Sequence, residues 1–230
     1  MISMQNEIKM TEEEITKSIE EHVNNITQEF KQGFEFMKKY PKSVTIFGSS
    51  RLTTASSHYH DAKRLAERIV KETGYSIITG GGPGIMEATN LGAKEAGGMS
   101  LGLNITLPYE QHLNPYATDS MVFKYFFTRK AMLTFEAEAY VFFPGGFGTF
   151  DELFSILTLM QTKKITPVPI ILFGKDFWNP VKAMIENTML KEHHTIEEKD
   201  IDLFVITNSI DEAIKIIKGS PVSEWSNMLG

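Results

Sequence analysis

The chain has 230 residues, and 23 Lys and Arg against 29 Asp and Glu give it a formal net charge of −6. This length fits one medium-sized domain or at most two small ones, and 42% hydrophobic residues are enough to bury a sizeable core. The absence of cysteine excludes disulfide frameworks, thiolate zinc sites and thiol nucleophiles, and an acidic balance without a dense Lys/Arg block argues against a nucleic-acid partner.

The N-terminus carries no targeting signal that can be read from its composition. Residues 1–9 lack the apolar core of a signal peptide. No apolar stretch of the chain approaches the roughly 20 residues that a membrane-spanning helix needs. We therefore expect a cytoplasmic protein with no membrane partner.

Residues 11–37 form the first predicted element, a charged amphipathic helix. Its apolar side chains recur every three or four residues, at Ile15, Ile19, Val23, Ile26, Phe30 and Phe34. Thr11 and Glu14 have capping-box spacing at its start. The helix either docks on the main domain or contacts a second subunit. We assign residues 1–40 to an N-terminal helical extension and residues 41–230 to one nucleotide-binding domain.

After Pro41, short β-rich runs alternate with helical stretches. The predicted strands are 44–47, 76–79, 99–104, 121–123, 139–143, 168–173 and 203–206, and the predicted helices are 58–72, 85–96, 129–137, 150–163, 179–190 and 210–218. Such alternation, with continuous apolar strands, indicates a parallel sheet that is covered on both faces. We predict an α/β fold with a doubly wound, mostly parallel, Rossmann-like sheet, plus the N-terminal helix. Ligands bind such sheets beyond the carboxyl ends of the strands.

Three of the loops at those strand ends are rich in glycine. They are Gly48-Ser49-Ser50, Gly80-Gly81-Gly82-Pro83-Gly84 and Pro144-Gly145-Gly146-Phe147-Gly148-Thr149. Each opens a helix whose free N–H groups favour an anion, so together they indicate a phosphate site, although glycine also simply permits tight turns. None of the loops fits G-x-G-x-x-G, which argues against NAD, and no Walker A sequence is present.

Arg129 and Lys130 stand where we expect the first turn of a helix. Cations are unfavourable at that end of the macrodipole unless an anion compensates them, which is mild support for a bound anion. Glu152 has two interpretations. With Thr149 it has capping-box spacing, so it could serve only the helix start. Alternatively, it is a carboxylate one turn above a phosphate loop, close to the sugar of a nucleotide.

Two segments resemble motifs of the LONELY GUY (LOG) family. The run Pro144-Gly145-Gly146-Phe147-Gly148-Thr149-Phe150-Asp151-Glu152 matches PGGxGTxxE, and Thr128-Arg129-Lys130 matches the family's arginine-lysine segment. The run from Gly80 to Glu87 looks like a third signature, and the resemblance covers residues 42–218. The family is often labelled "lysine decarboxylase-like". Its characterised members hydrolyse nucleoside 5′-monophosphates, including cytokinin riboside monophosphates, to free base and ribose 5-phosphate.

The resemblance implies an N-glycosidic hydrolase with Arg129 and Glu152 as the catalytic pair. It implies that the 5′-phosphate is held by Gly145, Gly146, Gly148 and Thr149, with Lys130 nearby, and that the nucleotide cleft is lined by Gly48, Ser49, Gly81 and Gly82. The plant members commonly carry Met-His-Glu/Gln before the Arg-Lys pair, where this chain has Phe126-Phe127-Thr128. That departure bears on the base that is preferred.

These residues can support the hydrolysis. Cleavage of an N-glycosidic bond passes through a transition state that resembles a sugar cation. A carboxylate such as Glu152 can stabilise this cation, or it can activate the attacking water. Arg129 would position the ribose and the carboxylate, or hold the phosphate.

We expect no cofactor and no metal. A pyridoxal phosphate decarboxylase needs a lysine for its Schiff base, and no lysine of the chain stands in a motif that assigns it this role. The histidine pairs His58/His60 and His193/His194 lack a clear third ligand.

Two other functions remain open. The main alternative is a non-catalytic carrier of a nucleotide or of molybdenum cofactor with the same fold; the joint presence of Arg129 and Glu152 argues for the enzyme. The other is an interaction protein that works through its N-terminal helix. Because family members are dimers or larger and helix 150–163 is apolar on more than one face, we also expect a homodimer or a higher homo-oligomer.

Overall fold

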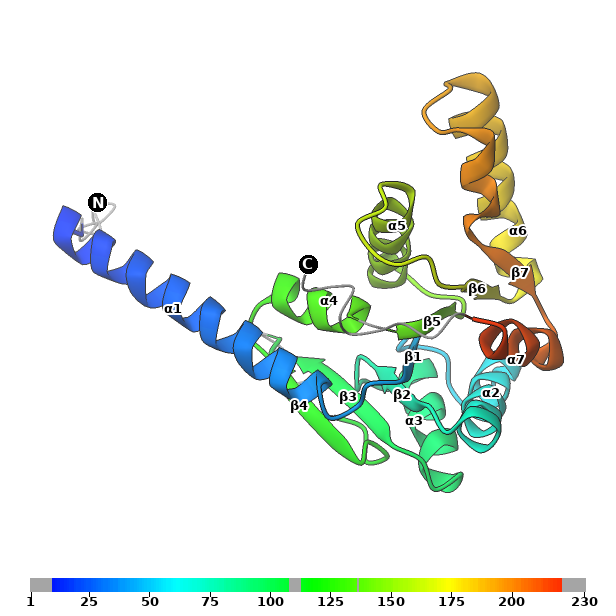
Figure 1. Cartoon of the computed structure of the whole chain (residues 1–230), viewed down its shortest axis with the longest axis horizontal. Helices are drawn as coiled ribbons and strands as arrows, with labels where there is room; N and C mark the ends of the chain where they lie inside the picture. Colours follow the sequence, from blue (N-terminus) through cyan, green and yellow to red (C-terminus); the bar gives the residue numbers. More distant parts are fainter. Residues whose placement is uncertain (1–9, 108–112, 136, 221–230) are drawn as a thin grey trace, which may run out of the picture.

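A single parallel sheet forms the centre of the protein, whose computed structural model describes residues 10–107, 113–135 and 137–220 (Figure 1). In this described part the strands lie in the order β4-β3-β2-β1-β5-β6-β7, and each neighbouring pair is parallel. The strands are β1 (Ser43–Phe47), β2 (Ser76–Thr79), β3 (Ser100–Ile105), β4 (Asp119–Phe123), β5 (Ala137–Phe142), β6 (Ile170–Phe173) and β7 (Val205–Thr207). The predicted fold class is confirmed.

Helices cover both faces of the sheet. They are α1 (Glu12–Met37), α2 (Ser57–Thr73), α3 (Ile85–Glu95), α4 (Phe126–Thr134), α5 (Phe147–Gln161), α6 (Lys175–Met184) and α7 (Ile210–Lys218), with a π-helix at Ile185–Glu192 and a 3₁₀ helix at Glu198–Leu203. One hydrophobic core holds apolar side chains of α2, α3 and α7, and the other holds those of α4, α5, α6 and the end of α1. The strands contribute side chains to both cores. In β5, for example, Val141 lies in the core with α2, α3 and α7, and its neighbours Tyr140 and Phe142 lie in the other core.

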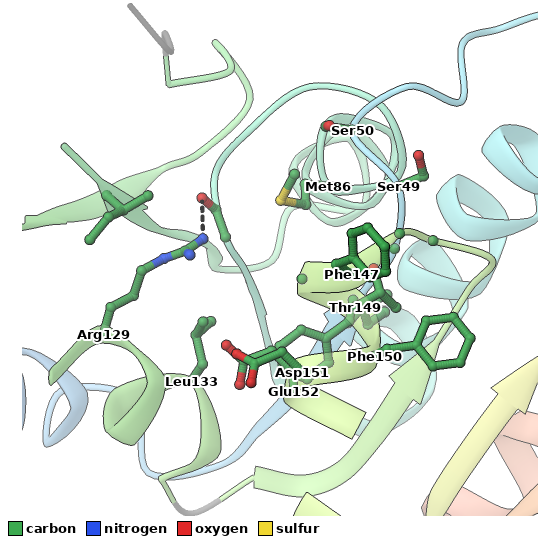
Figure 2. A pocket seen from close by; sticks show the side chains of 18 of the residues that line it. Ser49, Ser50, Met86, Arg129, Leu133, Phe147, Thr149, Phe150, Asp151 and Glu152 are labelled. Carbon is green, nitrogen blue, oxygen red and sulfur yellow. Dashed lines mark hydrogen bonds between the residues drawn. The ribbon is translucent and has the colours of Figure 1, made fainter. Parts of the chain in front are cut away.

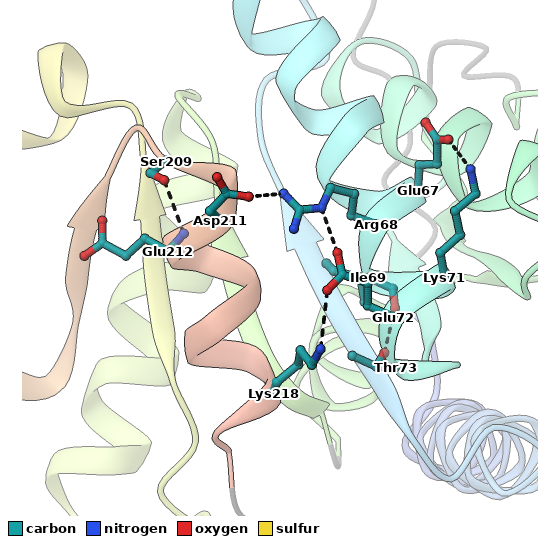
Figure 3. Close-up of polar contacts among 10 residues, drawn as sticks. All are labelled: Glu67, Arg68, Ile69, Lys71, Glu72, Thr73, Ser209, Asp211, Glu212 and Lys218. Carbon is teal, nitrogen blue, oxygen red and sulfur yellow. Dashed lines mark hydrogen bonds and ion pairs between the residues drawn. The ribbon is translucent and has the colours of Figure 1, made fainter.

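Exposed ion pairs join α2 to α7 on the face of the sheet that these two helices and α3 cover (Figure 3). The Arg68 guanidinium contacts Asp211 and donates from Nε to Glu72 Oε1 at 2.8 Å, while Lys218 Nζ lies 3.4 Å from Glu72 Oε2. Solvent screens such pairs, so the stability of this face comes chiefly from the apolar contacts beneath them.

Helix α1 docks chiefly through its C-terminal half, which holds all of its buried residues. The predicted capping box is present, with Thr11 and Glu14 each bonded to the other's backbone N–H. Near its end Phe36 and Met37 are buried in the core, whereas Ile15, Ile19 and Val23 are 45%, 59% and 53% exposed. In Figure 1 the blue first half of the helix extends away from the sheet.

Gly33 explains how closely the docked half of α1 approaches α4. A Cβ at this position would lie 2.7 Å from Met132 Sδ, too close for any larger residue without movement. The separation of the chain at residue 40 stays a prediction, and residues 1–9 lie outside the described part. In the described helices, none is both long and apolar enough for a membrane crossing.

Three helices begin at least three residues earlier than the sequence predicts, and one of them is α5, which starts at Phe147 instead of residue 150. Helix α4 starts at Phe126 instead of residue 129, so Arg129 lies at its fourth position. Helix α6 starts at Lys175 and runs through Pro180, which the prediction placed near the helix start. Buried Trp178 anchors that first part, because its indole N–H donates to the Phe142 carbonyl at 3.1 Å. The 3₁₀ helix was not predicted.

The strand order reverses between β1 and β5, and this reversal brings two glycine loops together. The Ser49 N–H donates to the Pro144 carbonyl at 3.0 Å, and the Ile85 N–H donates to the Ser49 carbonyl at 3.0 Å. Gly84 has φ +72, and a Cβ there would lie 2.4 Å from the Ser49 carbonyl oxygen. The loops after β1, β2 and β5 therefore meet at one edge of the sheet, where ligands of such folds bind.

Candidate active site

A cavity of about 790 Å³ opens at this edge (Figure 2). It is lined by residues of the loops after β1 and β5, by the first turns of α5 and by side chains of α4. Eight of the predicted site residues are among its lining: Gly48, Ser49, Arg129, Gly145, Gly146, Gly148, Thr149 and Glu152. The fold thus gathers in one cavity residues that lie up to about a hundred positions apart; their roles stay predictions.

Gly81, Gly82 and Lys130 are not among the residues that line the cavity. The two glycines are held by a buried neighbour instead, since Asn114 donates from its backbone N–H to the Gly81 carbonyl at 2.9 Å and from Nδ2 to the Gly82 carbonyl at 3.0 Å. Lys130 turns toward α5, where its Nζ lies 2.6 Å from Asp151 Oδ2 and donates to Ser155. Gly80 lines the cavity beside these two glycines, and Asp151, the partner of Lys130, lines it as well. The binding roles of Gly81, Gly82 and Lys130 stay predictions.

The start of α5 faces the cavity without a side-chain cap. Its N-cap is Gly146, and the helix begins at Phe147, so Thr149 and Glu152 both lie inside it. The predicted capping box is therefore wrong, because a Thr149 cap would need the helix to start three residues later. The first turn leaves backbone N–H groups available to an anion.

The glycines of these loops differ in the reason for their presence. Gly145 is required by packing, because a Cβ there would lie 2.0 Å from Thr149 Oγ1. At Gly146 and Gly148 a Cβ would meet no atom within 4 Å, and neither residue has positive φ. Neither a tight turn nor a close neighbour accounts for these two glycines. Without side chains, both residues leave the backbone of this turn open to the close approach of a ligand.

Glu152 is a buried carboxyl group on the second turn of α5. The residue is 9% exposed, and its Oε2 has no hydrogen-bond partner in the described part of the chain. Burial raises the pKa of the Glu152 carboxyl to about 7, against the lowering influence of the Lys130 and Arg129 charges. A carboxyl group with this pKa can change its protonation state near neutral pH, as acid–base chemistry requires.

Arg129 reaches the same cavity from α4 (Figure 2). Its Nε donates to the Leu103 carbonyl at 2.7 Å and its Nη2 donates to the Gly80 carbonyl at 3.3 Å. Burial lowers the pKa of the guanidinium, and the Glu152 charge raises it. Two carbonyl oxygens orient the group but do not neutralise it, so it retains charge and donors for an anion.

Sequence reasoning missed the apolar wall of the cavity. It is formed by Ile46, Met86, Ile105, Leu107, Phe126 and Leu133, of which Phe126 is 61% exposed. The only signal was the departure at Phe126 from the motif of plant relatives. Nothing in the spacing of the other residues distinguishes them from ordinary core side chains.

A pyridoxal phosphate Schiff base does not fit this cavity. None of the described residues that line it is a lysine. The nearest candidate in sequence, Lys130, is paired with Asp151. The described lining of this cavity therefore offers no amine for a Schiff base.

Comparison with known proteins gives one family and several distant relatives. The model of a family described as "Possible lysine decarboxylase" matches residues 86–217. A cytokinin riboside 5′-monophosphate phosphoribohydrolase of Rhodococcoides fascians is 23% identical over 77% of this chain and 90% of its own length. The Arabidopsis thaliana enzyme of the same name, LOG2, is 29% identical over 64% of this chain and 70% of its own length. Among solved structures, the molybdenum cofactor carrier protein of Chlamydomonas reinhardtii is 20% identical, with a TM-score of 0.58. The match covers 77% of this chain and 96% of the carrier protein, and at this identity it shows the fold alone.

Proposed function

The chain belongs to the LOG family, and from this membership we propose that it is a hydrolase of nucleoside 5′-monophosphates. It would cleave the N-glycosidic bond of AMP or of a cytokinin riboside 5′-monophosphate, releasing the free base and ribose 5-phosphate. One observation carries the proposal. A buried carboxyl group with an unpartnered oxygen, Glu152, faces a cavity whose glycine loop and arginine suit a phosphate.

The reaction is a displacement at C1′ of the ribose. Water attacks C1′ as the C1′–N bond breaks, and the electron pair of that bond leaves with the base, which takes up a proton. We assign Glu152, in its ionised form, to stabilise the positive charge that develops on the sugar and to accept a proton from the attacking water. This role requires the carboxylate to lie near C1′.

The phosphate serves as the anchor of the substrate. We assign it to the first-turn N–H groups of α5, beside Gly146, Gly148 and Thr149. Gripping the phosphate fixes the ribose, so that C1′ is held against the carboxylate without further loss of freedom in the transition state. Arg129 would bind the ribose or the phosphate with the guanidinium donors that its carbonyl partners leave free.

A non-catalytic carrier of the same fold is the second candidate. The Chlamydomonas reinhardtii carrier shares this fold, and the fold is compatible with carrying as well as with catalysis. Glu152 argues against it, because a carrier needs the phosphate loops but gains nothing from a buried, unpartnered carboxyl group.

We also propose that the protein is a homodimer or a larger homo-oligomer. A shallow groove runs along the outer face of α5 and is lined by Lys130, Phe147, Phe150, Asp151, Phe154, Ser155, Thr158 and Leu159. Phe147 is 97% exposed there. An exposed apolar surface of this kind favours a protein partner, and a second copy would cover it on both chains at once.

Incubation with a panel of nucleoside monophosphates tests the activity. We expect free base and ribose 5-phosphate from AMP or from prenylated adenine monophosphates. The matching nucleosides, which lack the phosphate anchor, should release little or no free base. Tight nucleotide binding with no product from any member would favour the carrier.

A further inference from the structure

The N-terminal helix reaches the start of the helix that carries Arg129, through one carboxylate. Glu29 of α1 accepts a hydrogen bond from the Lys124 N–H at 2.6 Å through Oε1, and one from the Tyr125 N–H at 3.2 Å through Oε2. The Thr128 hydroxyl also donates to Glu29 Oε2. One side chain of α1 therefore binds three groups at the beginning of α4.

Helix α4 has no N-terminal cap of its own. Its N-cap residue is Tyr125, whose side chain makes no capping hydrogen bond, and its first turn contains no acidic residue. Unsatisfied N–H groups and the positive end of the macrodipole would remain there without Glu29. Glu29, 95 positions before Lys124 in the sequence, accepts from the N-cap N–H and from the N–H before it, and it places a negative charge at the positive end of the helix.

Other contacts join α1 to α4 and to the residue before it, on both sides of Glu29 along the helix. The rings of His22 and Tyr125 meet edge to face at 5.1 Å, and Phe30 lies 6.3 Å from Phe127. Gly33, which has no side chain, leaves room for the side chain of Met132 of α4. Glu29 lies between these contacts, so its carboxylate is fixed from both sides.

We propose that Glu29 is a positioning residue for Arg129. Thr128, which donates to Glu29, directly precedes Arg129, whose Nε–H must meet the Leu103 carbonyl at 2.7 Å to direct the guanidinium into the cavity. Holding the first turn of α4 sets the position of that side chain. The N-terminal helix is thus part of the active site's support; the consequence for turnover rests on the proposed function.

A measurement without substrate tests the positioning directly. In NMR spectra of the full-length protein, the Arg129 Nε–H signal, identified by its absence in Arg129→Lys, should exchange slowly with solvent. We expect Glu29→Ala to speed that exchange by about tenfold or more, while Glu21→Ala, an exposed acid on the same helix, leaves it unchanged. Thr128→Val, which removes only the hydroxyl, should have a smaller effect in the same direction and serves if Glu29→Ala does not fold. Unchanged exchange in both variants would overturn the proposal.

A double-mutant cycle tests the consequence for catalysis. Misplacing Arg129 should lower kcat for AMP by about tenfold or more in Glu29→Ala, with a smaller change in KM. Glu29→Gln, which keeps one carbonyl acceptor, should recover part of the loss. In an Arg129→Ala background, adding Glu29→Ala should change kcat less than about twofold, because the two act as a unit. Losses that simply multiply would overturn the proposal. If the wild-type protein hydrolyses no nucleotide but the exchange result holds, the proposed function fails and the positioning role stands.

Discussion

Buried Glu152 and half-buried Arg129 lie in the wall of one cavity, and the protein holds them by different means. Two backbone carbonyls orient the guanidinium. The carboxyl group has an oxygen without a partner in the described residues and a pKa of about 7. An oriented cation and an acid that titrates near neutrality suit the two ends of a ribose phosphate, the anion and the reacting carbon.

The pH dependence of activity follows from the raised pKa of Glu152. Because the ionised carboxylate is the reactive form in our assignment, kcat/KM for AMP should rise with pH and level off above about pH 7. The substrate phosphate also titrates near pH 6, so the Glu152 carboxyl should be titrated separately in the free protein by carboxyl-carbon NMR. A midpoint near the ordinary value of 4.5 would contradict the assignment.

The same pKa has a consequence for stability. A folded-state pKa above the unfolded value of 4.5 means that Glu152 favours folding in its protonated form; this contribution is complete below about pH 4.5 and is lost as the pH rises through 7. Glu152→Gln removes the buried charge. It should raise the free energy of unfolding by about 1–3 kcal/mol at pH 8, and by little at pH 4.5. Denaturant titrations at the two pH values measure this difference. A lower free energy of unfolding for Glu152→Gln at pH 8 would show instead that the folded protein stabilises the ionised carboxylate.

At the scale of helices and strands, long-range contacts decided what the sequence could predict. The strands were predictable because a strand that is buried on both faces consists of a continuous run of apolar residues, such as Val141 to Phe143. Lys130 and Arg129 had indicated a bound anion at α4, but the structure supplies Asp151 for the first and places Glu29 at the helix start. Neither partner is adjacent in sequence, so local helix rules could not assign them. The glycine loops were recognised as one site because parallel strands end at one edge.

The glycine at the start of α5 gives a test of the phosphate site. Gly148 lies in the first turn, where an added Cβ meets no atom. Gly148→Ala should keep or raise stability, by up to about 1 kcal/mol, but raise KM for AMP by about tenfold because the methyl group stands where the phosphate approaches. Gly145→Ala, whose Cβ would collide with Thr149, should instead lower the melting temperature. Unchanged kinetics in Gly148→Ala would place the phosphate elsewhere.

At the scale of the whole molecule, two exposed apolar surfaces of the described residues bear on assembly. One is the groove on α5, and the other is the stripe of Ile15, Ile19 and Val23 on the projecting half of α1. Both helices were predicted from the sequence. Whether their apolar faces pack in the core or contact another subunit could not be predicted, because the same residue pattern serves both purposes. The structure answers this question for α1 only in part, since the buried residues of the helix all lie in its second half and the apolar side chains of its first half are exposed.

The oligomer should depend on the α5 groove. We expect light scattering of the wild-type protein to give a dimer or a larger multiple of the chain mass, and Leu159→Glu to shift it toward the monomer by placing a charge in the contact. Val122→Glu, on exposed β4, is the control and should not change the mass. If Ile19→Glu dissociates the assembly and Leu159→Glu does not, the α1 stripe is the interface.

The most direct test of the account compares wild-type protein with Glu152→Gln in the release of adenine and ribose 5-phosphate from AMP, with folding checked by melting temperature. Loss of a positioned acid–base or electrostatic group should lower turnover by roughly 10²-fold or more, and Arg129→Ala should do the same. Near-normal release of adenine by a folded Glu152→Gln variant would contradict the central claim that this carboxyl group acts at C1′.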